Sequence, residues 1–396
     1  LGDVYKRQAL FSVGTLAMPS TALASNERES LTTDSERYFK SEDIFNLEYV
    51  SEVQVSPNGK YVAYVRRSND IMSDSSRANV WLASVDGKSH RPLLSSKKSY
   101  YSIRWSPDGS RLAYLSNEEG KPQLYVRWMD TGQTALVTNV TSNPSNITWS
   151  PDGKHIAFTM SVDAKEKPLD IKMPKKPDGA KWSPSFQYMT KARYQADGRG
   201  ILEPAYTHIF IVPADGGTAR QLTSGNYHHN GRLSFSPDSD KIYFSANRSD
   251  NWEYEPVEGD IFSVDMMGNI AQLTNDKGLE SSPVVSPDGK HIAYARRDDE
   301  KVMYKNSYLY VMKSDGTDAQ NLTKDIDNSV SNFHWKDNKH VYFQQSVRGL
   351  AQVDVVSLSG SVKAVAKGLG GTTLGRPYVF GTYHAVDDVV AYTKGR

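Results

Sequence analysis

One short segment of the chain gathers side chains that could bind a charged group. Carboxylates accept strong, charge-assisted hydrogen bonds from ammonium groups, and aromatic rings add contact area. On an extended segment, residues two apart project to the same side, so two glutamates in that arrangement could converge on one ammonium. We therefore predict a binding site for the charged end of a peptide, with a solvated surface loop as the alternative. The candidate substrate-binding residues are Arg248, Trp252, Glu253, Tyr254 and Glu255.

The rest of the sequence offers no catalytic centre. The Gly-x-Ser-x-Gly elbow of α/β-hydrolases is absent; the one Gly-x-Ser, Gly87-Lys88-Ser89, lies in a predicted turn. The chain has no cysteine, which excludes disulfides, thiolate zinc sites and cysteine nucleophiles. His228-His229 is the only adjacent histidine pair, and no acidic residue stands at metal-ligand spacing from it. We predict no catalytic residue, no metal and no cofactor in this chain.

A repeated motif organises most of the sequence. Each copy has an apolar residue, a spacer and an aromatic residue or valine, followed by Ser-Pro-Asp/Asn-Gly and an alternating apolar strand. Copies begin near residues 51, 101, 145, 231, 281 and 331, the last one degenerate. The prolines of the regular copies are Pro57, Pro107, Pro151, Pro237 and Pro287.

This motif predicts four short strands per repeat. Proline fixes φ at the first turn position, Asp caps the turn and Gly accepts positive φ, so each copy joins two antiparallel strands. A third strand, an Asp-Gly turn and a short fourth strand follow. Four strands in about 45–50 residues make one propeller blade. The turn carboxylates are therefore expected to be structural: Asp108, Asp152, Asp238 and Asp288.

The predicted fold is an all-β, seven-bladed β-propeller of four-stranded antiparallel blades over residues 51–396. Six blades are complete, and a partial seventh begins near Gly371. Because the chain stops in mid-blade, leaving an open strand edge, we expect it to be truncated at its C-terminus. Pro151 and Pro237 are too far apart for one blade, so residues 162–204 are expected to form an insertion in blade three. Residues 25–50 are expected to form an N-terminal segment with a short helix beginning at Ser41.

Composition and the N-terminus bear on location. The formal net charge is +1, which gives no support for a nucleic-acid or membrane partner. Lys6 and Arg7 precede an apolar run, and Ala22-Leu23-Ala24 has the small-x-small form of a cleavage site. Residues 1–24 are therefore predicted to be the remnant of a signal peptide, and the protein to be periplasmic or secreted.

The repeats resemble the TolB-type propeller, and three further stretches are more specific. The order of these three stretches along the chain resembles that in the N-terminal propeller of bacterial serine peptidases of the prolyl oligopeptidase family, on the acylaminoacyl-peptidase and dipeptidyl-peptidase side. The resemblance covers about residues 40–396. The stretches are Tyr194–Gly200 leading to Tyr206–Gly217, Ser245–Arg248 with Trp252–Pro256, and Asp327–Asn332.

In that family an α/β-hydrolase domain with a Ser-Asp-His triad follows the propeller, which restricts entry to short or unfolded peptides. The resemblance therefore implies the substrate-gating propeller of an exported serine peptidase that hydrolyses short peptides. Its partners would be those peptides and the hydrolase domain of the same protein, and the present chain alone would be inactive. The alternative is a stand-alone TolB-like propeller for protein or ligand binding.

Overall fold

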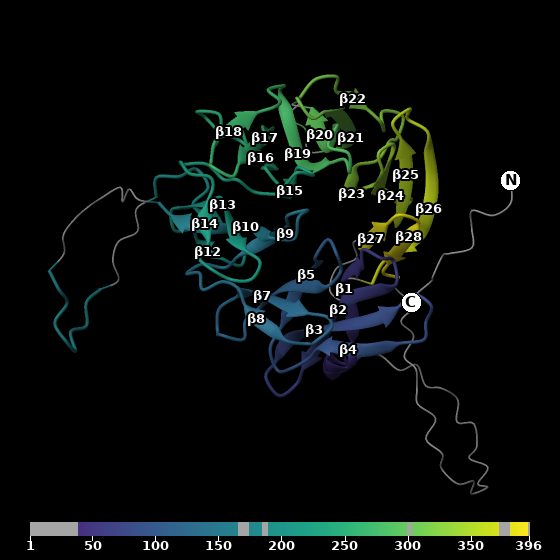
Figure 1. The fold of residues 1–396 in the computed structure, drawn as a ribbon. Coiled ribbons are helices and arrows are strands. Elements are labelled where there is room, and N and C mark those ends of the chain that lie inside the picture. The colour runs from purple at the N-terminus through teal and green to yellow at the C-terminus, as the bar shows by residue number, and fades with distance from the viewer. Residues whose placement is uncertain are drawn as a thin grey trace, which may run out of the picture.

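The computed structural model describes residues 39–164, 174–183, 189–298, 302, 304–371 and 381–394. Their strands form a ring of six four-stranded antiparallel sheets, each one blade, around a central axis (Figure 1). In every blade the first strand lies nearest the axis and the fourth lies at the rim. The all-β propeller of four-stranded blades is therefore confirmed.

The strands follow the sequence repeats closely. Blade one contains β1 (Glu48–Val55), β2 (Tyr61–Asp70), β3 (Ser75–Ser84) and β4 (His90–Leu94). Blade two contains β5 (Tyr100–Trp105), β6 (Arg111–Ser116), β7 (Gln123–Trp128) and β8 (Thr134–Leu136). Blade three contains β9 (Ser145–Trp149), β10 (His155–Asp163), β13 (Ala205–Pro213) and β14 (Arg220–Gln221).

The second half of the ring repeats the pattern. Blade four contains β15 (Ser234–Phe235), β16 (Lys241–Ala246), β17 (Asp260–Asp265) and β18 (Ile270–Gln272). Blade five contains β19 (Gly278–Val285), β20 (His291–Asp298), β21 (Tyr308–Lys313) and β22 (Gln320–Asn321). Blade six contains β23 (Val330–Asp337), β24 (His340–Val347), β25 (Leu350–Ser357) and β26 (Val362–Leu369).

The expected count of seven blades is corrected to six. After blade six the described residues add only a two-stranded sheet, β27 (Tyr383–Val386) and β28 (Val389–Tyr392). This hairpin lies between blades six and one: the Val55 N–H donates to His384 Nδ1 at 3.1 Å, and Tyr342 Oη donates to the Asp387 carbonyl at 3.0 Å. Two strands with alternating apolar residues have the same sequence pattern whether or not two further strands complete the blade. The sequence therefore could not distinguish this hairpin from the start of a seventh blade. Residues 372–380, where the expected seventh blade would begin, lie outside the described residues.

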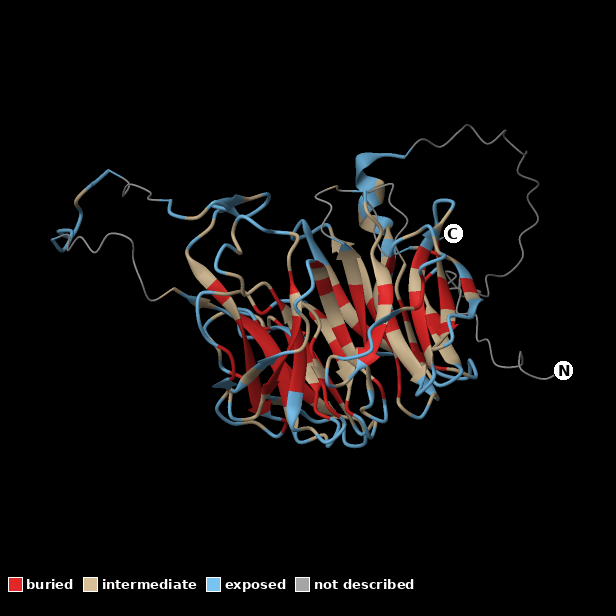
Figure 2. Ribbon diagram, turned by 90° about the horizontal axis from the view of Figure 1, so that it is seen from above, coloured by how far each residue is buried: buried red, intermediate tan, exposed pale blue. Residues whose placement is uncertain are grey.

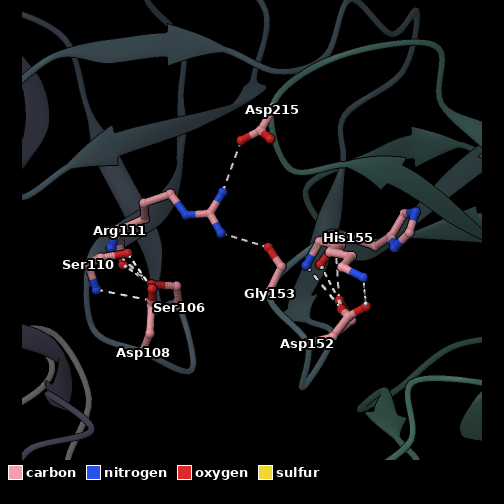
Figure 3. Close-up of polar contacts among 10 residues, drawn as sticks. Ser106, Asp108, Ser110, Arg111, Asp152, Gly153, His155 and Asp215 are labelled. Carbon is pink, nitrogen blue, oxygen red and sulfur yellow. Dashed lines mark hydrogen bonds and ion pairs between the residues drawn. The ribbon is translucent and has the colours of Figure 1, made fainter.

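The Ser-Pro-Asp-Gly turns are held by their own side chains (Figure 3). In blade two, Ser106 Oγ donates to Asp108 Oδ1 at 2.6 Å and accepts the Arg111 N–H at 2.9 Å. Blade three repeats this arrangement, and Gly153 adopts a φ of +68°, in the region that favours glycine. The turn aspartates are thus structural, as expected.

Neighbouring blades are joined by apolar packing and by repeated polar contacts. The Trp149 indole donates to the Arg104 carbonyl at 3.0 Å. Arg111 donates to the Gly153 carbonyl at 2.7 Å, as Figure 3 shows. Buried residues fill the strands of adjacent blades, whereas the loops at both ends of the ring are exposed (Figure 2). Each blade therefore buries its faces against its neighbours.

Two segments depart from the repeat. The short helix at the N-terminus is η1 (Ser41–Asn46), a 3₁₀ helix with Glu42 and Asp43 in its first turn. Residues 164–204 separate β10 from β13, and their described part holds a small hairpin, β11 (Gln195–Ala196) and β12 (Gly200–Ile201). Residues 1–24, with the predicted signal peptide, lie outside the described residues.

Candidate functional site

The predicted binding segment is the connection between β16 and β17. It leaves the end of the ring opposite the Ser-Pro-Asp-Gly turns, because those turns join first and second strands and this loop joins the second to the third. The insertion between β10 and β13 joins the equivalent strands of blade three, and η1 precedes β1 on the same face (Figure 2). Two long connections of adjacent blades therefore share one face of the ring.

The β16–β17 loop is a series of turns, so the expected extended segment is wrong. The Tyr254 N–H donates to the Asn251 carbonyl at 2.9 Å, and the Asn247 side chain donates to the Glu255 carbonyl at 2.8 Å. Asn and Ser side chains favour such local bonds over extended backbone. The glutamates consequently do not act as a pair: Glu253 turns toward the insertion, with 16% of its side chain exposed, while Glu255 faces solvent.

The loop and the insertion border an open cavity of about 400 Å³. One wall comes from the insertion, one from the β14–β15 connection and one from the β16–β17 loop. Aromatic rings and both signs of charge meet at the surface of this cavity, which suits a small ligand with an apolar body and a charged end. Its lining residues are Thr190, Lys191, Asn226, Tyr227 and Asp250–Tyr254.

The Lys191 ammonium forms an ion pair with the Glu253 carboxylate across this cavity. The ammonium also lies 5.7 Å from the centre of the Trp252 ring and 5.8 Å from that of Tyr206, within cation–π range. Burial disfavours the charged form of Glu253, but the bonds from Lys191 and from the Ala192 N–H outweigh it and lower its pKa. The hydrogen bond to Glu253 in turn raises the pKa of Lys191. Both groups are therefore charged at neutral pH.

Arg248 lies next to the cavity and contacts one of its lining residues, Tyr227. Its guanidinium bonds to His229 Nε2 at 2.7 Å and lies 4.7 Å from the centre of the Tyr227 ring. A guanidinium can only donate, so Nε2 of His229 accepts and its Nδ1 carries the proton, 3.2 Å from the Thr207 carbonyl. Burial, reinforced by Arg248 and His208, lowers the pKa of His229 to about 3. Arg248 thus packs against Tyr227, which lines the cavity, and does not line the cavity itself.

Of the five predicted residues, three line the cavity: Trp252, Glu253 and Tyr254. Arg248 lies behind it, and Glu255 lies outside it. Sequence reasoning missed Lys191 and Tyr227. Lys191 belongs to the insertion, which is not part of the repeat, so the repeat could not predict its position. Tyr227 could have been noticed as the aromatic residue directly before the His228-His229 pair.

The described part of the chain contains no cluster of three His, Asp or Glu residues that could hold a metal ion. Among the same residues no helix is long and apolar enough to cross a membrane.

Two protein families match the chain. Residues 58–205 match the family described as "TolB beta propeller domain", and residues 182–295 match "Dipeptidyl peptidase IV (DPP IV) N-terminal region". The second match contains Lys191, Tyr227 and the entire β16–β17 loop. The chain therefore combines a TolB-like propeller with a region related to a peptidase N-terminal region.

Two curated relatives are peptidases by name. "Uncharacterized peptidase YuxL" of Bacillus subtilis is 30% identical over 52% of this chain and 31% of its own length. "Dipeptidyl-peptidase 5" of Porphyromonas gingivalis is 23% identical over 92% of this chain and 53% of its own length. The chain thus spans about half the length, or less, of these relatives.

A solved structure shows the same fold. Pyrococcus horikoshii acylaminoacyl peptidase superposes with a TM-score of 0.64 at 17% identity, over 82% of this chain and 47% of that one. The resemblance to the propellers of prolyl oligopeptidase family peptidases, seen first in the repeats and three short stretches, is confirmed by these matches.

Proposed function

We propose that this chain is the substrate-gating propeller of an exported serine peptidase that acts on short peptides, with an α/β-hydrolase domain elsewhere in the same protein. The observation that carries the proposal is the cavity between the insertion and the β16–β17 loop. It lies within the stretch that matches a dipeptidyl peptidase N-terminal region. Its volume, about 400 Å³, is at the small end of the range of roughly 300–1,000 Å³ for ligand sites. That volume is large enough for the end of a peptide.

Glu253 would recognise the free α-amino group of the peptide. One carboxylate oxygen bonds to Lys191, whereas the other accepts only a 3.3 Å bond from the Ala192 N–H. A carboxylate can accept about four hydrogen bonds, so this second oxygen has capacity for an incoming ammonium. The rings of Trp252 and Tyr227 would contact the first side chain of the peptide.

The parent enzyme provides the test. The coding sequence beyond residue 396 should be read, and the complete reading frame expressed and treated with a fluorophosphonate probe. A uniquely labelled serine in a downstream Gly-x-Ser-x-Gly motif, with cleavage of short peptides, is expected. A complete reading frame with no hydrolase domain would reject the peptidase proposal and leave a stand-alone TolB-like binding propeller.

Recognition can be tested separately in that enzyme. Glu253→Gln should lower kcat/KM for free-amine peptides by about 10- to 150-fold, which corresponds to roughly 1.5–3 kcal/mol for hydrogen bonds to charged groups. N-acetylated peptides should show no such loss. Glu255→Gln, outside the cavity, is the matched control. Equal activity of both variants on both peptides would show that this loop does not recognise the peptide amino group, and it would not contradict the gating role.

The proposed export is supported by the order of Lys6-Arg7, an apolar run and Ala22-Leu23-Ala24. Expressed with an initiator methionine in a Gram-negative host, the protein should reach the periplasm with Ser25 at its N-terminus. Uncleaved protein in the cytoplasm would contradict export.

A further inference from the structure

A cluster of cationic and imidazole side chains lies on the innermost strands, away from the peptide cavity. Four residues form this axial cluster: Arg104 on β5, Arg232 just before β15, His334 on β23 and His384 on β27. These strands surround the centre of the ring (Figure 1). Strand alternation explains the direction of these side chains. The residue directly before each of three of them is buried in the blade packing, so Arg104, His334 and His384 project to the opposite side of their strands. The buried neighbours are Ile103, Phe333 and Tyr383.

Contacts of Arg232 show that the cluster links blades that are not neighbours. Its guanidinium donates to the Phe333 carbonyl at 2.5 Å and lies 3.2 Å from His334 Nδ1. Arg232 belongs to blade four and His334 to blade six, so these bonds connect two blades that are separated by blade five. The His334 ring contacts that of His384, with centroids 5.3 Å apart.

Positive charge in the cluster exceeds negative charge. No ion pair within the described ranges includes Arg104 or Arg232. The carboxylate that acts on Arg104 is Glu52, which already accepts the N–H groups of Ser102 and Ile103 at 3.1 and 3.2 Å. Two guanidiniums therefore share at most one carboxylate, and an uncompensated charge away from bulk water is costly.

The imidazoles add donors and no acceptors. Nδ1 of His384 accepts the Val55 N–H, and Nδ1 of His334 faces the Arg232 guanidinium, so both neutral rings carry their proton on Nε2. His334 Nε2 is buried with no hydrogen-bond partner among the described residues. Burial first, and then the two arginines, lower the pKa of His384 to about 3, while burial and Arg104 lower the pKa of Arg232 to about 10. The site thus disfavours more positive charge and offers N–H groups to a negative one.

We propose that the axial cluster binds a small oxyanion, a carboxylate or a phosphate, between Arg104 and Arg232. Planar guanidinium groups match the paired oxygens of both anions, and each bond would be charge-assisted. This site is distinct from the peptide cavity and does not depend on the proposed peptidase role.

The test measures thermal unfolding of the chain with inorganic phosphate added at constant ionic strength. Phosphate should raise the midpoint of unfolding in a saturable manner, because a ligand that binds only the folded state stabilises it. Arg232→Met and Arg104→Met should each weaken phosphate affinity at least tenfold. Arg111→Met, which removes a peripheral arginine paired with Asp215, should retain the wild-type affinity.

Two further arms complete the experiment. The first arm compares an N-acetylated dipeptide that has a free carboxylate with the amide of the same dipeptide. A shift of the unfolding midpoint with the acid, but not with phosphate, indicates that the anion is a peptide end. A shift with phosphate, but not with the acid, indicates a free inorganic anion. Should the variants fold poorly, ¹⁵N-histidine spectra of the wild type should show phosphate moving the imidazole resonances of His334, whose Nδ1 lies beside Arg232. The absence of a shift with both phosphate and the peptide acid, or an equal shift in wild type and both axial variants, would overturn the proposal.

Discussion

The Lys191 ammonium and the Glu253 carboxylate join two long connections of adjacent blades by an ion pair. Lys191 comes from the insertion of blade three and Glu253 from the β16–β17 loop of blade four. This pair closes one side of the peptide cavity and orients the carboxylate that we assign to recognition. Its loss should therefore affect the loop more than the fold.

Lys191→Met tests this relationship. Because the lysine side chain is 38% exposed, the free energy of unfolding should fall by no more than about 1 kcal/mol, the range for exposed ion pairs. Amide hydrogen exchange at Ala192 and Trp252 should accelerate, since the loop loses its tie to the insertion. Lys154→Met, which removes an exposed lysine near Asp152, is the control. Unchanged exchange at both amides would show that the pair does not order the loop.

The turn serines make a prediction about stability. Ser150 Oγ is buried and accepts the His155 N–H at 2.9 Å, so Ser150→Ala leaves that N–H without a partner. We expect a loss of about 1–3 kcal/mol in the free energy of unfolding, measured by denaturant titration. Ser110→Ala removes an exposed hydroxyl bonded to Asp108 and should cost less than about 0.5 kcal/mol. Similar losses for both would mean that the buried turn hydroxyl has no special role.

The sequence predicted the blades well because each Ser-Pro-Asp-Gly turn is specified locally. Pro107, Asp108 and Gly109 set the turn by their own conformations and side chains, so the repeat reports directly on strand order. Counting the blades was harder. The Val386–Val389 turn has the same local signal in a two-stranded sheet as in a full blade, and only long-range pairing distinguishes them.

The cavity could be predicted only in part. The aromatic and acidic content of the β16–β17 loop drew attention to Trp252, Glu253 and Tyr254. Its backbone path depends on side-chain bonds such as that from Asn247 to the Glu255 carbonyl, which turn the loop and separate the two glutamates. Lys191 reaches the cavity from 62 residues away in sequence, and nothing local predicts such a contact.

A buried glutamate and a half-buried aspartate give the fold a pH dependence. Glu280 is 1% exposed, and burial raises its pKa to about 7; burial, with Glu258 and Asp276 nearby, raises the pKa of Asp260 to about 6. Between the ordinary pKa values, 4.5 for Glu280 and 3.8 for Asp260, and these raised values, the folded state holds protons that the unfolded chain has released. The contribution of these groups to stability is therefore full at low pH and is lost as pH rises toward 7.

Glu280→Gln should remove most of the loss of stability that occurs as pH rises toward 7. Relative to wild type, the variant should gain about 2–3 kcal/mol more in the free energy of unfolding at pH 8 than at pH 5, because most of the rise in the pKa of Glu280 from 4.5 to about 7 is expressed across that range. The comparison with wild type at each pH cancels the opposite dependence from buried histidines such as His229. Exposed Glu255→Gln should show no such difference. A constant difference between Glu280→Gln and wild type across this range would exclude Glu280 as the titrating group.

Titration calorimetry of this chain with short peptides tests the central claim most directly. Dialanine and N-acetyl-dialanine should be titrated into wild type, Glu253→Gln and the control Glu255→Gln. The account predicts that wild type and Glu255→Gln bind the free-amine peptide, and that acetylation or Glu253→Gln each weakens binding at least tenfold, about 1.4 kcal/mol. Equal affinity for both peptides, or unchanged affinity in Glu253→Gln, would contradict recognition of a peptide amino group by this propeller.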